Sequence, residues 1–270
     1  MKRTSLILAS ALVFAAPVAQ AADMAVKAPA PPAAPVMSWT GFYLGVNVGY
    51  VIQSDPSAVT IFTQPGTDPF TPQSLSTSAT SFIGGGQWGY NWQFNNSWVL
   101  GYEGDFKGLS TSTSFCRETD RGNCVDGGNN NRGALFFNEK TQWLTSERAR
   151  LGVTWNSLLV YGTGGVAWGR INSTETAACA TAGCGNNATS NVTTASFSNT
   201  RSGWVAGLGT EAMFWSNWSA KLEYLHYDLG SLTNAFTTAA NVGSYGVSWT
   251  RKLHYDTVSV GLNYHFGGWR

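Results

Sequence analysis

Apolar and polar residues alternate with a period of two along several stretches of the chain. From Phe42 to Tyr50 the even positions are Phe, Leu, Val, Val and Tyr, whereas Tyr, Gly, Asn and Gly stand between them. Residues 82–94 and 98–107 repeat the alternation, and the polar face of 98–107 is also charged. Because successive side chains of a β-strand point to opposite faces, each stretch predicts a strand with one apolar face.

Further strands are predicted in the second half of the chain, for a total of eight. They cover residues 142–155, 158–170, 202–214, 218–229 and 252–266. In 158–170 the glycines at 162, 164 and 165 leave too few side chains to assign the two faces.

Short and long connections alternate between these strands. Tight turns are expected at Asn95–Ser97, Asn156–Ser157 and Ser216–Asn217, in steps of 61 residues (156 − 95 and 217 − 156). Long polar connections are expected near 53–80, 110–140, 171–201 and 230–251. Bacterial outer-membrane barrels have short periplasmic turns and long outer loops, and an even strand number returns both ends of the chain to the periplasm. The pattern predicts an all-β, eight-stranded antiparallel transmembrane β-barrel.

Composition favours this barrel over a water-soluble one. Only 11% of the residues are charged, against a usual figure of about 25%, while 13% are aromatic. Outside the first 21 residues, no segment has the 18 or so apolar residues of a spanning helix, so a membrane chain must satisfy its backbone between strands. A soluble lipocalin-like barrel would have an apolar interior, whereas here the charged residues share one face and Trp residues lie near the strand ends, as in membrane-barrel girdles.

The N-terminus predicts export and a separate leader. Lys2 and Arg3 precede an apolar run, Leu6–Val18, and small residues end at Ala21. This pattern indicates a signal peptide, 1–21, cleaved after Ala21; a membrane-anchoring helix would need about 20 apolar residues. Residues 22–37 are expected to form an Ala/Pro-rich periplasmic leader, and 38–270 the barrel. Without Lys2 and Arg3, 14 basic residues (16 − 2) stand against 15 acidic ones, so no nucleic-acid partner is expected.

Charged residues on the polar strand faces should meet in the lumen as an ion-pair network. Because eight strands leave an interior that side chains can fill, we expect this lumen to be plugged. Glu147 shares its parity with Leu151 and should face lipid, unless it reaches the headgroups or the register shifts by one. The residues expected in the network are Glu103, Asp105, Lys107, Arg148, Arg150, Glu211, Lys221 and Glu223.

Cysteine and histidine offer two further candidate sites. Cys116 with Cys124 and Cys179 with Cys184 are expected to form two local disulfides, since zinc sites usually have tighter spacing and a nearby His. His226 and His254 stand in a repeated Leu-His-Tyr-Asp, and a hairpin centred near residue 240 would place them opposite each other. They are candidate ligands for a metal or hemin iron, although such rim positions usually hold girdle residues.

Several segments resemble a known family, the small outer-membrane β-barrel proteins of alphaproteobacteria, described as opacity-protein-like, hemin-binding-like or porin family. The matching stretches are WTGFYLGVNVGY, WVLGYEGDF, RARLGV, LLVYGTGGVAWG, NWSAKLEYLHYDLG and VSVGLNYHF. They cover the predicted strands and leave out the loops. The resemblance implies an outer-membrane location, with lipids, lipopolysaccharide and the outer-membrane assembly machinery as partners. The chain continues past Phe266 as Gly-Gly-Trp-Arg, whereas outer-membrane proteins commonly end on an aromatic residue.

No catalytic chemistry is expected. The chain has three His, and none belongs to a catalytic motif, so the protein is predicted to be no enzyme and to need no cofactor. The predicted function is that of a structural, surface-exposed outer-membrane protein that contributes to envelope integrity and surface interactions. A small diffusion porin and a hemin-binding, metal-binding or adhesive surface protein that acts through its loops remain alternatives; the extracellular ligand or host surface is unknown.

Overall fold

The chain forms long β-strands joined at one end by tight turns. A computed structural model describes residues 37–62, 73–118, 122–123, 133–179, 191–215, 217–237 and 246–267. The predicted signal peptide, residues 22–36 of the predicted leader and the last three residues lie outside this range. Among the described residues, no helix is long and apolar enough to cross a membrane. The strands are β1 (Gly41–Phe62), β2 (Gln73–Phe94), β3 (Trp98–Glu118), β4 (Gly122–Asn123), β5 (Gly133–Trp155), β6 (Leu158–Cys179), β7 (Asn191–Trp215), β8 (Trp218–Thr237) and β9 (Gly246–His265).

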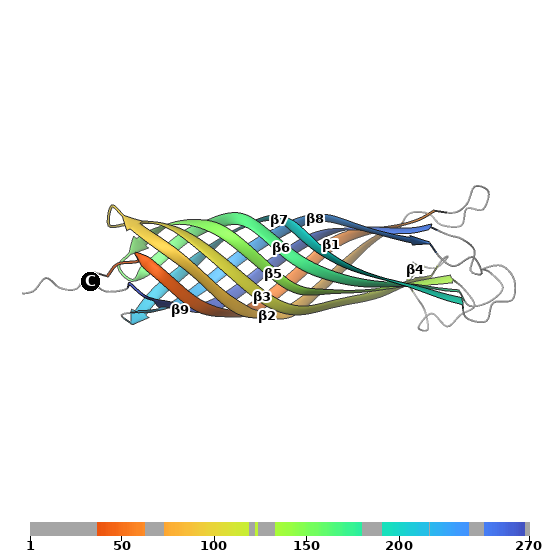
Figure 1. Cartoon of the computed structure of the whole chain (residues 1–270), viewed down its shortest axis with the longest axis horizontal. Helices are drawn as coiled ribbons and strands as arrows, with labels where there is room; N and C mark the ends of the chain where they lie inside the picture. Colours follow the sequence, from red (N-terminus) through yellow and green to blue (C-terminus); the bar gives the residue numbers. More distant parts are fainter. Residues whose placement is uncertain are drawn as a thin grey trace, which may run out of the picture. The chain divides into compact units, whose positions relative to one another are not determined.

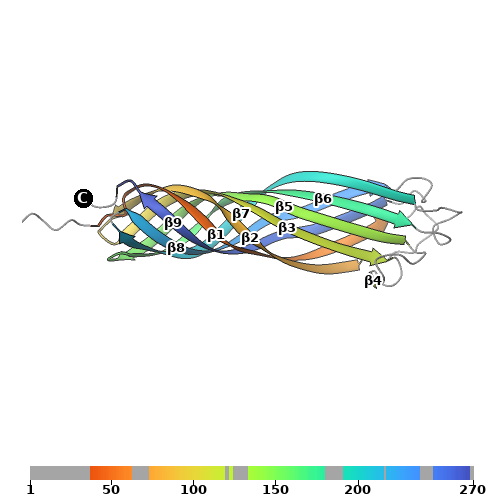
Figure 2. The same cartoon turned by 90° about the horizontal axis from the view of Figure 1, so that it is seen from below.

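Eight long strands close into a ring, which confirms the predicted barrel. Neighbours around the ring are β1, β2, β3, β5, β6, β7, β8 and β9, and β9 pairs with β1 again. The pairings in this ring are antiparallel, and the two-residue β4 pairs with the end of β3. Figures 1 and 2 show the strands winding around one axis, with tight turns at the end where β9 finishes. We call this the turn end and the opposite one the loop end.

Asparagines shape the tight turns where the sequence predicted them. Asn95, Asn96 and Asn156 have φ angles of 50°, 59° and 52°, in the left-handed region that asparagine tolerates better than most residues. Residues 95–97 and 156–157 form turns as predicted, and Asn217 lies in a turn while Ser216 is outside the described range. These turns hold adjacent strands antiparallel and fix their register.

The predicted long connections were wrong in extent, because the strands continue into them. The ring strands have 20–25 residues, whereas a membrane-spanning strand needs about 9–11. Much of the stretches expected as loops, near 53–80, 110–140, 171–201 and 230–251, belongs to strands, and residues 63–72, 119–121, 124–132, 180–190 and 238–245 lie outside the described residues. The barrel therefore extends well beyond the length that a bilayer requires.

Polarity reverses in this extension. The outer wall there carries hydroxyl pairs such as Thr176 and Thr194, whose oxygens are 3.1 Å apart. The inner wall carries apolar side chains such as Phe137 and Trp249, each about 2% exposed. In the described strands, an outward apolar face is present only in the lipid-facing belt, so the sequence pattern of the extension is similar to that of a polar loop.

The belt has its apolar face outside, as the membrane assignment requires. Phe42, Leu44, Val46, Val48 and Tyr50 are 42–61% exposed, whereas the intervening Tyr43 and Asn47 are buried. In β6, whose faces the sequence left open, Val160 and Val166 face outward and Leu159 and Tyr161 inward. The terminal strand β9 also keeps the predicted outward row of alternate residues from Val258 to Tyr264, and Phe266 continues it.

Glu147 faces outward within the belt. It pairs with Gly104 on β3 and Val166 on β6 in an unbroken register, so the suggested one-residue shift at this point is wrong. The Tyr102 hydroxyl donates a hydrogen bond to its carboxylate. This contact gives the outward carboxylate one partner on the surface of the barrel.

Candidate functional site: the charged lumen

The structure brings together the eight charged side chains expected in the lumen, at the level of the belt. All eight are 3% exposed or less. They come from β3, β5, β7 and β8, at alternate positions of strands whose other face meets lipid. Four carboxylates and four cations balance in charge, which matters because an uncompensated charge in such an interior is costly.

Glu103 lies at the centre of this network. Its Oε1 accepts hydrogen bonds from Arg148 and, at 2.7 Å, from Lys221 Nζ. Its Oε2 accepts from Arg150 Nη1 at 3.1 Å and from the Tyr43 hydroxyl at 2.6 Å. One carboxylate thus joins three cations, each held by a charge-assisted bond.

The contact between Lys221 and Glu103 crosses the whole lumen. Lys221 belongs to β8 and Glu103 to β3, and three strands separate β3 from β8 in either direction around the ring. Lys221 Nζ therefore lies 2.7 Å from Oε1 of a glutamate that comes from the opposite wall. Lys107 on β3 likewise donates to the Tyr227 hydroxyl on β8 at 3.2 Å.

The remaining charges pair around this hub. Arg148 Nη1 lies 3.2 Å from Asp105 Oδ2, which also lies 3.0 Å from Lys107 Nζ. Arg150 Nη2 lies 2.7 Å from Glu211 Oε2, and Arg148 Nη2 lies 3.4 Å from Glu223 Oε2. Each of the four cations therefore contacts at least one carboxylate.

Inward glycines make space for the bulky members of the lumen. A Cβ on Gly89 would lie 2.4 Å from the Tyr43 ring, and one on Gly209 would lie 2.5 Å from the Tyr161 ring. The two tyrosines flank Arg150, whose guanidinium carbon is 5.6 Å from the Tyr43 ring centroid and 4.1 Å from that of Tyr161. Such stacking stabilises a cation beyond its ion pairs.

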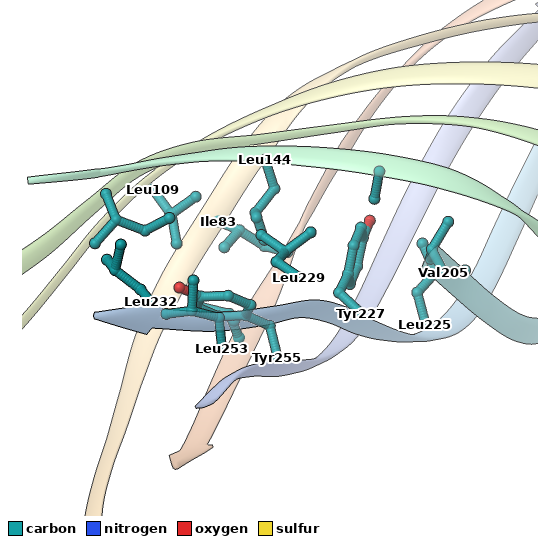
Figure 3. Close-up of a cluster of buried hydrophobic side chains, with 13 residues drawn as sticks. Ile83, Leu109, Leu144, Val205, Leu225, Tyr227, Leu229, Leu232, Leu253 and Tyr255 are labelled. Carbon is teal, nitrogen blue, oxygen red and sulfur yellow. The ribbon is translucent and has the colours of Figure 1, made fainter. Parts of the chain in front are cut away.

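An apolar layer fills the lumen next to the network on its loop side. Figure 3 shows its side chains converging from opposite strands. The cluster contains Val51, Ile83, Leu109, Leu144, Ala167, Ile171, Val205, Leu225, Tyr227, Leu229, Leu232, Leu253 and Tyr255. Beyond it the Thr141 and Tyr255 hydroxyls lie 3.1 Å apart, and Arg251 on β9 contacts Glu139 on the opposed β5 at 2.5 Å.

A second apolar cluster follows toward the loop end, and it contains Leu135, Phe137, Ala177, Val247 and Trp249. The order of layers can be read along β5, whose inward residues from the turn end include Arg150, Arg148, Leu144, Glu139 and Phe137. Charged and apolar layers therefore alternate along the lumen.

Glu175 occupies the polar layer between the two apolar clusters. It lies on β6 beyond the lipid-facing belt and is 1% exposed. Asn234 Nδ2 donates to its Oε1 at 3.3 Å, and Oε2 has no hydrogen-bond partner among the described residues. Burial raises the pKa of Glu175 to about 7, an effect that the Asn234 contact only partly opposes.

A cavity of about 650 Å³ opens at the turn end. Residues of the tight turns at 95–97 and 156–157 line it, together with Met37, Gln93, Thr154, Trp155, Met213, Phe214 and Trp215. Met37 and Met213 also belong to the apolar cluster around Trp39 and Tyr161, which lies beside the charged network. The cavity thus borders packed side chains on its inner side.

The histidine pair differs from its prediction. The register pairs His226 with Asp256 and His254 with Asp228, so the hairpin is centred on residue 241 and the two His are not opposite each other. His226 Nδ1 lies 2.8 Å from Asp256 Oδ1, His254 Nε2 lies 3.6 Å from Asp228 Oδ1, and the two imidazole rings are 6.1 Å apart. No group of three or more potential metal ligands occurs in the described part of the chain.

The predicted disulfides are only partly within view. Cys116, near the end of β3, is disulfide-bonded. Its predicted partner Cys124 lies outside the described residues, as does Cys184, the predicted partner of Cys179. Both pairings therefore stay predictions.

Sequence reasoning missed the neutral members of the network. Asn263 Nδ2 donates to Glu211 at 2.7 Å, and the His265 ring nitrogen lies 3.2 Å from the same carboxylate. Gln87 connects Asn47 with Asn263. The signal was available in the odd-numbered polar positions of 42–50, 82–94 and 252–266, which share the lumen face with the charges.

Comparison with known proteins agrees with this architecture. Residues 6–266 match the family described as outer membrane protein beta-barrel domain. The 31 kDa outer-membrane immunogenic protein of Brucella melitensis is 36% identical over 97% of this chain and 99% of its own length. The 22 kDa outer membrane protein of Rhizobium leguminosarum is 28% identical over 74% and 69%.

A solved structure with a similar fold is that of outer membrane protein OprG from Pseudomonas aeruginosa, at 11% identity and a TM-score of 0.42, covering 84% of this chain and 97% of that one. The family match spans most of the chain, and the sequence relatives from Brucella and Rhizobium are alphaproteobacterial outer-membrane proteins. The chain belongs to the outer-membrane β-barrel family and is an outer-membrane protein.

Proposed function

We propose that this protein is a closed, non-enzymatic barrel that does not conduct ions, contributes to the integrity of the outer membrane and displays its four longer connections outside the cell. The observation that carries the proposal is the contact between Lys221 and Glu103, whose atoms meet at 2.7 Å from opposed walls. Eight-stranded barrels have an interior about wide enough for side chains, and wide channels appear at about 16 strands.

Further contacts support closure away from the network. The lumen is crossed again between β5 and β9 by Arg251 with Glu139 at 2.5 Å, and by Thr141 with Tyr255 at 3.1 Å. The apolar clusters lie on either side of this second crossing. An ion entering from the loop end would have to displace two apolar layers and separate buried ion pairs.

Planar-bilayer recording tests the closed lumen. The refolded protein should give no steady conductance, while an open porin recorded in the same lipid gives discrete steps. Replacing Arg148 and Arg150 with Ala removes two of the four cations of the network, so this variant should show transient openings and lower heat stability. Large and reproducible channels in the unaltered protein would reject the proposal and favour a diffusion porin.

Display of the loop end outside the cell is tested by labelling. Ser196 lies on the exposed outer wall of β7, and Asn156 lies in an exposed tight turn at the other end. Each is replaced by Cys in a separate variant, Ser196→Cys or Asn156→Cys. In intact cells, a membrane-impermeant maleimide should label Ser196→Cys and leave Asn156→Cys unlabelled until the outer membrane is permeabilised. The reverse pattern would show that the loop end faces the periplasm.

A further inference from the structure

The outer wall changes chemistry just beyond the belt on three adjacent strands. Trp143 on β5, Trp168 on β6 and Trp204 on β7 face outward, as in the aromatic girdles that mark the interface of membrane barrels. Beyond Trp168, β6 includes the ten residues from Arg170 to Cys179, about 30 Å along the strand. Figure 2 shows β5 and β6 running on toward the loop end. The wall at this level lies where headgroups meet the barrel.

Outward positions in this part of β5, β6 and β7 are rich in hydroxyl and amide groups. Two cations stand among them, and no Asp or Glu occupies an outward position on the described extension of these three strands. The exposed cations are Lys140 and Arg170. This arc of the wall is therefore positively charged.

Lys140 and Arg170 lie on adjacent strands. Lys140 pairs with Asn172 across β5 and β6, and Arg170, the next outward residue of β6, pairs with Trp143 beyond a register shift in β5. Arg170 Nη2 donates to Ser198 Oγ at 3.1 Å, and Ser198 Oγ donates to Asn172 Oδ1 at 2.8 Å. The neutral Ser198 hydroxyl therefore positions the Arg170 guanidinium. A guanidinium has five N–H donors, and those that do not contact Ser198 can bind an anion.

The neighbouring strands β8 and β9 have different electrostatics, beginning with Asp228, which pairs with Trp204 of β7. On β8 and β9 the outward residues at the corresponding boundary include Asp228 and Asp256, each facing a histidine. Lys252, the outward cation two residues from His254, pairs with Ser231 of β8. Among the described outward residues at and beyond this boundary, the two cations without an outward carboxylate on their own strands are therefore those of β5 and β6.

We propose that the outer wall of β5–β7 next to the tryptophans binds the phosphorylated headgroup of an outer-leaflet glycolipid, lipopolysaccharide. Arg170 and Lys140 would contact its phosphates, because guanidinium and ammonium groups bind phosphate through charge-assisted bonds. The hydroxyl and amide groups around Ser198 and Asn172 would hydrogen-bond its sugars. This inference rests on the proposed orientation, with the loop end outside the cell.

Native mass spectrometry of the detergent-refolded full chain tests this surface. Purified rough lipopolysaccharide, the same glycolipid after enzymatic dephosphorylation, and inorganic phosphate are the three probes. Lys140→Gln with Arg170→Gln removes the two cations, Lys140→Arg with Arg170→Lys keeps them, and Lys252→Gln is the matched control on β9. Heat-modifiable gel migration checks that every variant is folded.

The expected result is that the Gln pair weakens lipopolysaccharide binding at least about tenfold, the loss that follows from removing charged hydrogen bonds. The affinity of the Lys140→Arg with Arg170→Lys variant and that of Lys252→Gln should stay within about threefold of the affinity of the unaltered protein, a difference of the size that independent substitutions commonly show. Equal binding by the Gln pair, or equal binding of dephosphorylated glycolipid, would overturn the inference. Inorganic phosphate binding as tightly as lipopolysaccharide would also overturn it, since the site would then be for a free anion. Because this measurement is made in detergent, its outcome is independent of the labelling and conductance tests of the proposed function.

Discussion

Glu103 is the residue whose loss should destabilise the barrel most clearly. Glu103→Gln leaves four cations against three carboxylates in a lumen where the carboxylate contacts Lys221 at 2.7 Å and Arg150 at 3.1 Å. Breaking a buried ion pair by removing one partner costs about 3–5 kcal/mol, because the other charge stays buried and uncompensated. We expect the free energy of unfolding to fall by about that amount.

A second substitution separates charge imbalance from lost packing. Lys221 has its shortest ion pair with Glu103, and its second, with Glu223, is longer at 3.6 Å. Adding Lys221→Met to Glu103→Gln restores three cations and three carboxylates, so the double variant should recover at least about 2 kcal/mol of the loss. Lys221→Met alone should be destabilising, because it leaves a carboxylate in excess.

Urea unfolding in lipid vesicles, followed by tryptophan fluorescence and by heat-modifiable gel migration, measures these differences. The two single variants and the double variant form a cycle whose coupling energy reports the interaction of the pair. A loss below about 1 kcal/mol in Glu103→Gln would show that the charges are screened by water. Additive losses in the double variant would refute the argument from charge balance.

Three further substitutions test other parts of the barrel. Gly89→Ala should destabilise by about 2–3 kcal/mol through the 2.4 Å clash with the Tyr43 ring, whereas Gly86→Ala, whose Cβ would meet nothing closer than 3.8 Å, should be nearly neutral; urea unfolding compares them. Glu175 has a pKa of about 7, above the usual 4.3 or so of an unfolded glutamate. The folded state therefore binds this proton more tightly than the unfolded state, and the resulting stabilisation is complete below about pH 4 and is lost as the pH rises through 7. Glu175→Gln should flatten this part of the pH–stability profile and, after allowance for screening, gain about 1 kcal/mol at pH 8; an unchanged profile would contradict the assignment. Glu147→Gln should be more stabilising in vesicles than in detergent, by up to about 1 kcal/mol, because it removes a lipid-facing charge; equal effects in both would contradict that placement.

The sequence predicted the belt well because lipid imposes a strict contrast between the two faces of a strand. Phe42 to Tyr50 alternates without exception, and the charged residues of β3 and β5 share one parity that places them in the lumen. Beyond the belt that contrast reverses, and at several positions it becomes weak. Outward Thr174 and Ser196 and inward Ser173 differ little in polarity, so the pattern there is that of a loop although the backbone continues as a strand.

Lumen contacts between opposed strands could not be read from the sequence, because they depend on the closure of the ring. Arg148 and Arg150 lie beside β3, and their reach to Glu103 follows from strand order alone. The meeting of Lys221 with Glu103 also requires side chains of matching length and inward glycines that leave room for them. The same reasoning explains why Glu139 and Arg251 were missed, since they are 112 residues apart (251 − 139) and lie in stretches taken for loops. A long barrel that reverses its polarity outside the membrane can fill its lumen with apolar residues there, since its outer wall no longer has to be apolar. Closure of the lumen and exposure of a polar outer wall therefore have one cause. Alternate residues of each strand face either the lumen or the outside, and the outside changes from lipid to water along the strand.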